Sequence, residues 1–239
     1  MRFTLASGIL LLVGACGTSS GGEIVVSAAS SLTDAFGAVE TAYEDAHPGV
    51  DVVVNTAGSR ALAEQILQGA PVDVFAPADT AVMDRVTDHV ADAVVFATNR
   101  PALVVPRGNP GGVTGLADLA RDDLLVGLCA EGIPCGDVAR AALARAEVTV
   151  SPATEEPNVR ALLTKVEAGE LDAGIVYATD AAAGAVETVP ITGAPDLVVR
   201  YPIAAVTAAP NPGGAADFVA FVLSDDGRAI LDEYGFGSP

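Results

Sequence analysis

Short apolar runs typical of β-strands alternate with amphipathic, helix-like runs along almost the whole chain after residue 22. Residues 24–26 predict a strand, and residues 31–46 predict a helix with apolar side chains at helical spacing, namely Leu32, Phe36, Val39 and Tyr43. Strands that alternate with helices favour parallel pairing, with helices covering both faces of the sheet. The pattern therefore predicts an α/β fold with mixed, mostly parallel sheets.

The alternation is interrupted by a turn-rich segment at residues 106–112 and then starts again. Extended runs near residues 98–106 and 198–206 predict two crossovers between two β/α units. We therefore expect lobe 1 to comprise residues 23–100 and 204–239, and lobe 2 to comprise residues 101–203. Further predictions include a continuous helix over residues 80–90 and a strand at residues 148–150.

The charge balance excludes several classes of partner. The 239 residues include 12 Lys and Arg against 31 Asp and Glu, a formal net charge of −19. Nucleic acid attracts basic surfaces, so it is not an expected partner. Aromatic residues make up 5% of the chain and Trp is absent, which disfavours an aromatic platform for sugars.

The N-terminus predicts export. Met1 and Arg2 precede a short apolar run at residues 5–13, which is too short to be a resident membrane helix. Small residues then lead to Cys16, an arrangement that resembles a bacterial lipobox, and residues 18–22 form a Ser/Gly-rich tether. We expect residues 1–22 to be signal peptide and tether, with cleavage before Cys16 and lipidation of that residue. The alternative is an ordinary secretory signal.

Two other cysteines, Cys129 and Cys135, lie in a compartment that permits disulfides, and their spacing fits no zinc motif. A disulfide and two free thiols are the two interpretations. Asp73 and Asp79 follow one another closely enough to suggest a metal site, but two carboxylates at one strand end more often form a turn and a helix cap.

Four predicted helix N-termini carry small or uncharged residues, at Ser31, Ser59, Gly136 and Val159. A helix N-terminus offers unpaired N–H groups and a partial positive charge, so several of them together bind an anion without basic side chains. Tyr177 ends a predicted strand and adds a hydroxyl donor. A Ser at a helix start is, taken alone, usually just a helix cap, so the interpretation depends on all these residues together.

Several ordered segments resemble the periplasmic molybdate-binding proteins of ABC importers, which have the type II periplasmic-binding-protein fold. The resemblance covers residues 23–237, and the segments that carry it are residues 24–36, 57–66, 69–79, 134–136, 158–160, 174–181 and 234–236. It implies a two-lobed fold with two crossovers and, from the N-terminus, a lipoprotein form. The expected protein is extracytoplasmic and is anchored to the cell membrane by its N-terminal lipid.

The resemblance also implies a function. Molybdate or tungstate is bound between the lobes, by hydroxyl and N–H groups of Ser31 and Ser59, the N–H groups of Cys135 and Val159, and the Tyr177 hydroxyl. No cofactor and no catalysis are expected. The expected partners are an ABC permease and its ATPase subunit, and we expect the binding protein to be a monomer. Cys135 stands where the family commonly has Ala.

Three alternatives stay open at this point. The first is a six-coordinate centre, because Glu155 and Glu156 lie near enough in sequence to add carboxylate ligands. Gly58 also departs from the family, which commonly has Ser at this position. A receptor for sulfate or phosphate would use the same scaffold. A Ser-dependent hydrolase is the third, but no G-x-S-x-G motif surrounds either Ser, and only His47 and His89 are available as a base.

Overall fold

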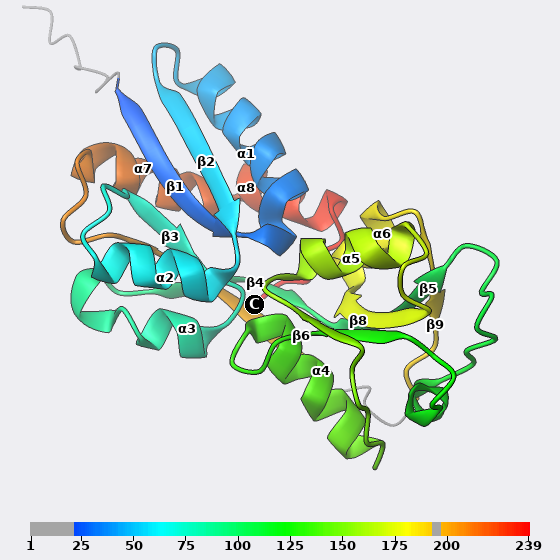
Figure 1. Ribbon diagram of the computed structural model, residues 1–239. Coiled ribbons are helices and arrows are strands. Elements are labelled where there is room, and N and C mark those ends of the chain that lie inside the picture. Colours follow the sequence, from blue (N-terminus) through cyan, green and yellow to red (C-terminus); the bar gives the residue numbers. More distant parts are fainter. Residues whose placement is uncertain (1–21, 193–196) are drawn as a thin grey trace, which may run out of the picture.

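The computed structural model describes residues 22–192 and 197–239 and shows two five-stranded sheets (Figure 1). The first sheet has the order β2 (Asp51–Ala57), β1 (Glu23–Ala29), β3 (Val74–Ala76), β10 (Val199–Ala205), β4 (Val94–Asn99). The second has the order β7 (Thr154–Glu156), β6 (Val126–Cys129), β8 (Ala173–Tyr177), β5 (Pro101–Pro106), β9 (Val186–Val189). We call the two units lobe 1 and lobe 2 from here on.

Helices cover both faces of each sheet (Figure 1). In lobe 1, one face carries α1 (Thr33–Ala46), α7 (Pro212–Leu223) and α8 (Asp225–Glu233), and the other carries α2 (Ser59–Leu67) and α3 (Thr80–Asp84). In lobe 2, one face carries α5 (Val159–Glu167) and α6 (Ala178–Ala183), and the other carries α4 (Pro134–Arg145). Short 3₁₀ helices are η1 (Ser30–Leu32), η2 (Thr87–His89) and η3 (Leu116–Ala120).

The largest apolar core runs through both lobes. It includes Phe36 and Phe218 from lobe 1 and Leu162 and Val176 from lobe 2, all buried. Burial of apolar surface is the main favourable term in folding, so a shared core holds the two sheets in one molecule. In the part of the chain that the structure describes, no helix is long and apolar enough to cross a membrane.

The chain passes between the lobes twice. It leaves lobe 1 through Arg100, between β4 and β5, and returns between β9 and β10. Strand β10 pairs with β4 and β3 from Val199 to Ala205, so these residues already belong to lobe 1. The lobe boundary therefore lies before Val199, earlier than the 203/204 boundary expected from the sequence. The C-terminal segment also joins lobe 1, where Gly237 bridges to Thr98.

The α/β class, the mixed sheets flanked by helices and the two crossovers are confirmed. The pairing is evenly mixed rather than mostly parallel: among the described strands, four pairs are parallel and four are antiparallel. The reason is that β5 and β10, which follow the two crossings, each enter their new sheet antiparallel to both of their neighbours.

Three local predictions differ from the structure. Residues 148–150 form no strand; Val148 and Val150 contribute side chains to the lobe 2 core without backbone pairing, and β7 lies further along. The edge strand β9 was not predicted, because its half-exposed residues show no apolar run. The helix expected over residues 80–90 ends at Asp84, and η2 follows it.

Candidate ligand-binding site

The five residues predicted to bind a ligand all line one small cavity between the lobes. They come from places where strands end and helices begin: Ser31 after β1, Ser59 after β2, Cys135 after β6, Val159 after β7 and Tyr177 at the end of β8. Ligands of open α/β sheets bind at the carboxyl ends of strands. The other lining residues are Ala29, Ser30, Gly58, Ala78, Ile133, Pro134 and Asn158.

Helices α2 and α4 both start at the cavity without a side-chain cap. The residue before α2 is Gly58, which has no side chain, and the residue before α4 is Ile133, which has no polar group. Pro134 has no N–H, so the first N–H of α4 belongs to Cys135. The first turn of a helix leaves its N–H groups without intrahelical partners, so Ser59 and Cys135 each bring such a donor to the cavity.

Helix α5 is capped differently. The Asn158 side chain accepts a 2.9 Å hydrogen bond from the Ala161 N–H, which satisfies the third position of the helix. This cap leaves the N–H of Val159, the first helical residue, for a ligand in the cavity. Val159 thus contributes through its backbone, while its buried side chain belongs to the apolar core.

Two serine hydroxyls are positioned by partners within lobe 1. Ser31 Oγ lies 3.0 Å from the Tyr201 hydroxyl, and Ser59 Oγ accepts a 3.0 Å hydrogen bond from the Ala78 N–H. A hydroxyl that accepts one hydrogen bond still has its own proton to donate. Ser59, and Ser31 when Tyr201 donates to it, are therefore set up as donors.

Tyr177 carries the least satisfied polar group of the cavity. Its side chain is 1% exposed, and its hydroxyl forms no hydrogen bond of normal geometry, although it lies close enough to the Tyr201 hydroxyl to interact with it. Burial raises the pKa of Tyr177 well above its ordinary value of 10.0, so the phenol keeps its proton. Because native proteins pair nearly all buried polar groups, an unpaired donor that lines a cavity indicates a ligand with an acceptor atom.

The cavity is small and contains no ionic group. The cavity volume is about 10 Å³, near the roughly 10–15 Å³ that one buried water needs. Among the described residues that line it, none carries a charged side chain. The arrangement suits a compact acceptor-rich ligand, and does not suit a sugar or a peptide.

The structure directs Glu155 and Glu156 elsewhere. Glu155 forms an ion pair with Arg140, and Glu156 forms one of 2.6 Å with Lys165. Neither carboxylate lines the cavity. The six-coordinate alternative therefore has no carboxylate ligand in this arrangement.

A disulfide lies directly beside the cavity. The Cys129 and Cys135 Sγ atoms are bonded at 2.10 Å, so the end of β6 is joined to the first turn of α4. A Cβ on Gly136 would lie 2.1 Å from the Ala130 carbonyl oxygen, which shows how tightly this loop folds back on the helix. The bond constrains the segment that presents the Cys135 N–H.

The two aspartates considered as metal ligands have structural roles in the fold. Asp73 accepts hydrogen bonds from the Val25 and Asn211 N–H groups and ties three segments together, and Asp79 caps α3. In residues 22–192 and 197–239, no cluster of three or more His, Cys, Asp or Glu is arranged to hold a metal.

Neither candidate base is near the serines. The His47 ring stacks on Tyr43 at 4.1 Å, and His89 is exposed in η2. Both histidines lie outside the residues that line the cavity. Cys16, the predicted lipidation site, lies outside the described residues.

Sequence reasoning missed the partners that orient the serines. Tyr201 is 170 positions from Ser31 and the Ala78 N–H is 19 positions from Ser59, so no local motif links either pair. The sequence signal for Tyr201 was its place in the extended run near residues 198–206, where the second crossover was expected.

Comparison with known proteins identifies the family of this chain. The profile of the bacterial extracellular solute-binding protein family matches residues 24–237. The molybdate-binding protein ModA of Mycobacterium tuberculosis is 40% identical over 227 residues, 93% of this chain and 87% of that protein.

Solved structures show the same fold. The periplasmic molybdate-binding protein of Azotobacter vinelandii has a TM-score of 0.76 at 18% identity, over 90% of this chain and 99% of that one. The sulfate-binding protein SubI of M. tuberculosis has a TM-score of 0.72, also at 18% identity, over 90% of this chain and 86% of that one. These two likenesses speak for the fold alone. From the match over residues 24–237 and the 40% identity to ModA, the chain belongs to the bacterial extracellular solute-binding protein family.

Proposed function

We propose that this protein binds molybdate, and tungstate in competition with it, as a bare tetrahedral dianion in the cavity between the lobes. The donors are the Ser31 and Ser59 hydroxyl and N–H groups, the Cys135 and Val159 N–H groups and the Tyr177 hydroxyl. The observation that carries the proposal is the unpaired, fully buried Tyr177 hydroxyl in a cavity lined by neutral donors. The 40% identity to a protein named for molybdate binding supports the choice of anion.

Neutral donors suffice for a dianion when water is excluded. Each hydrogen bond is electrostatically stronger in a low-dielectric interior than in water. Three helix N-termini add their partial positive charges at the same point. The site thus holds the anion without a basic side chain, and the protein transforms nothing chemically and needs no cofactor.

We expect the lining to favour fully deprotonated oxyanions. At neutral pH much phosphate carries a proton, which needs an acceptor in the site, and none of the described lining side chains is a carboxylate. A fully deprotonated dianion, molybdate or sulfate, matches a cavity of donors. These two dianions differ in size, and molybdate is our assignment because the relative with 40% identity is named for molybdate binding.

The same proposal places the protein outside the cytoplasm. Signal cleavage before Cys16 and lipidation of that residue attach the mature chain to the membrane through a Ser/Gly tether. As a monomer, it closes its two lobes over the anion and delivers it to an ABC permease with its ATPase subunit. Radiolabelled palmitate incorporated by wild type and lost in Cys16→Ser tests the anchor.

Calorimetric titration of the purified, tag-free protein tests the ligand. Molybdate and tungstate are expected to bind in competition with one another at one site per chain. Sulfate is expected to bind more weakly, and phosphate more weakly still. Sulfate binding tighter than molybdate would replace our proposal with a sulfate receptor, and no binding of any oxyanion would overturn the site itself.

A further inference from the structure

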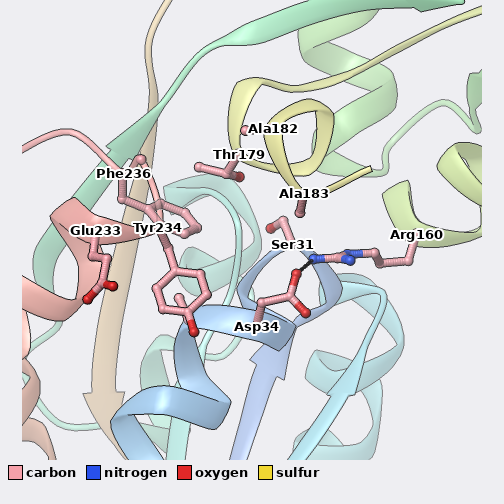
Figure 2. A pocket seen from close by; sticks show the side chains of 11 residues that line it. Ser31, Asp34, Arg160, Thr179, Ala182, Ala183, Glu233, Tyr234 and Phe236 are labelled. Carbon is pink, nitrogen blue, oxygen red and sulfur yellow. Dashed lines mark hydrogen bonds and ion pairs between the residues drawn. The ribbon is translucent and has the colours of Figure 1, made fainter. Parts of the chain in front are cut away.

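Arg160 is the second residue of α5, directly after Val159, and it lies between two carboxylates outside the cavity. Its Nη2 atom is hydrogen-bonded to Asp34 Oδ2 on α1, and its Nε atom lies 3.0 Å from Asp180 Oδ1 on α6. Figure 2 shows the Arg160 guanidinium reaching the Asp34 carboxylate beside Ser31. One cation thus connects three separate segments.

Those three segments all contribute residues to the proposed site. Asp34 lies three positions after Ser31, Arg160 one position after Val159, and Asp180 three positions after Tyr177. Asp34 belongs to lobe 1, whereas Arg160 and Asp180 belong to lobe 2. The Asp34–Arg160 pair therefore spans the lobes next to the cavity, and the Arg160–Asp180 pair stays within lobe 2.

The two carboxylates differ in burial. The Asp180 side chain is fully buried, while those of Arg160 and Asp34 are 30% and 41% exposed. The buried Asp180 carboxyl and the Arg160 guanidinium are in contact within lobe 2, so this contact does not depend on lobe 1. Arg160 is therefore preorganised to meet Asp34, and little side-chain entropy is lost when the pair forms.

We propose that Asp34 and Arg160 form an interlobe latch that slows release of the bound anion without contacting it. Arg160 acts as a positioning residue: Asp180 holds it on lobe 2, and Asp34 engages it when the lobes come together. The ligand part of this inference rests on the proposed molybdate binding, whereas the interlobe ion pair is a feature of the structure itself.

Asp34→Asn is the appropriate variant. Arg160→Ala would leave the buried Asp180 carboxyl without its partner and mix a folding defect with the effect on the latch. Asparagine keeps the size of Asp34 and removes its charge at a partly exposed position.

Glu64→Gln is the matched control. Glu64 pairs with Arg85 at 2.5 Å inside lobe 1, with 45% and 40% of the two side chains exposed. Both variants remove one negative charge and one partly exposed ion pair, and only Asp34→Asn breaks a pair between lobes.

The test loads each protein with isotopically enriched molybdate and chases it with natural-abundance molybdate, reading the retained isotope by mass spectrometry. A partly exposed ion pair predicts dissociation about two- to fivefold faster in Asp34→Asn, with Glu64→Gln close to wild type. Equal rates in wild type and both variants would overturn the latch.

If wild type itself retains no molybdate, the proposed function fails and the latch is judged by small-angle scattering. A larger radius of gyration for Asp34→Asn than for Glu64→Gln then supports the latch, and equal radii overturn it.

Discussion

Replacing Tyr177 by Phe separates the energetics of the site from those of the fold. The hydroxyl is buried and forms no hydrogen bond of normal geometry within the protein, so its deletion removes at most a weak interaction with the Tyr201 hydroxyl. An unsatisfied buried polar group costs about 1–3 kcal/mol, and the variant should be at least as stable as wild type. In the ligand-bound protein the same deletion removes a hydrogen bond to a dianion.

The two effects have opposite signs. A hydrogen bond to a charged group contributes roughly 1.5–3 kcal/mol, which weakens molybdate binding about 10- to 150-fold at 1.4 kcal/mol for each factor of ten. Without ligand, each kcal/mol gained raises the melting temperature by about 2–4 °C for a chain of this size. Calorimetric titration and thermal unfolding of the same preparation measure both quantities.

Tyr201→Phe is the matched control. Its hydroxyl is equally buried but lies 3.0 Å from Ser31 Oγ, so its deletion breaks a protein hydrogen bond. This variant should lose about 1 kcal/mol of stability and bind molybdate more weakly only through Ser31. Unchanged affinity in Tyr177→Phe, or a melting temperature below that of wild type, would refute the assignment of Tyr177 as a ligand donor.

Three further predictions follow from the structure. Thiol-blocked protein should take up two more blocking groups after reduction, and replacing Cys129 and Cys135 by Ser should cost about 2 kcal/mol for so short a loop; no difference in intact mass would exclude the disulfide. Gly58→Ala should weaken molybdate binding, because a Cβ would lie 2.6 Å from a backbone carbonyl oxygen of lobe 2; Gly37→Ala, with open space around its Cβ, should bind as wild type. Burial raises the pKa of Asp180 from 3.8 to about 7, so the native state binds the extra proton between these values and stability from this group is lost as pH rises towards 7. Asp180→Asn should lack that component, and denaturant titrations of the two proteins with parallel pH profiles from 4 to 8 would contradict it.

The fold was predictable where the signal is local. The apolar strand of residues 24–26 and the amphipathic helix that follows have patterns that depend on near neighbours in sequence. The edge strand β9 was missed because Glu187 and Thr188 give it no apolar periodicity. The strand predicted at residues 148–150 was wrong because Val148 and Val150 pack against the core without pairing with another strand.

The residues of the candidate site were predictable from local sequence signals together with the family resemblance. Each of its residues stands at a strand end or a helix start, and the resemblance placed them in one constellation. Their supporting partners were not predictable: Tyr201 reaches Ser31 across 170 positions, and Asp34 reaches Arg160 across 126. Such pairs depend on tertiary geometry, which no spacing in the chain encodes.

X-ray absorption at the molybdenum K-edge of the loaded protein tests the central claim most directly, because it reports the coordination of the bound metal. Binding by neutral hydrogen-bond donors leaves the anion intact, so we expect one molybdenum per chain with the four-oxygen tetrahedral spectrum of free molybdate. A six-coordinate spectrum with added protein ligands would contradict the account, as would a protein that retains no molybdenum after gel filtration.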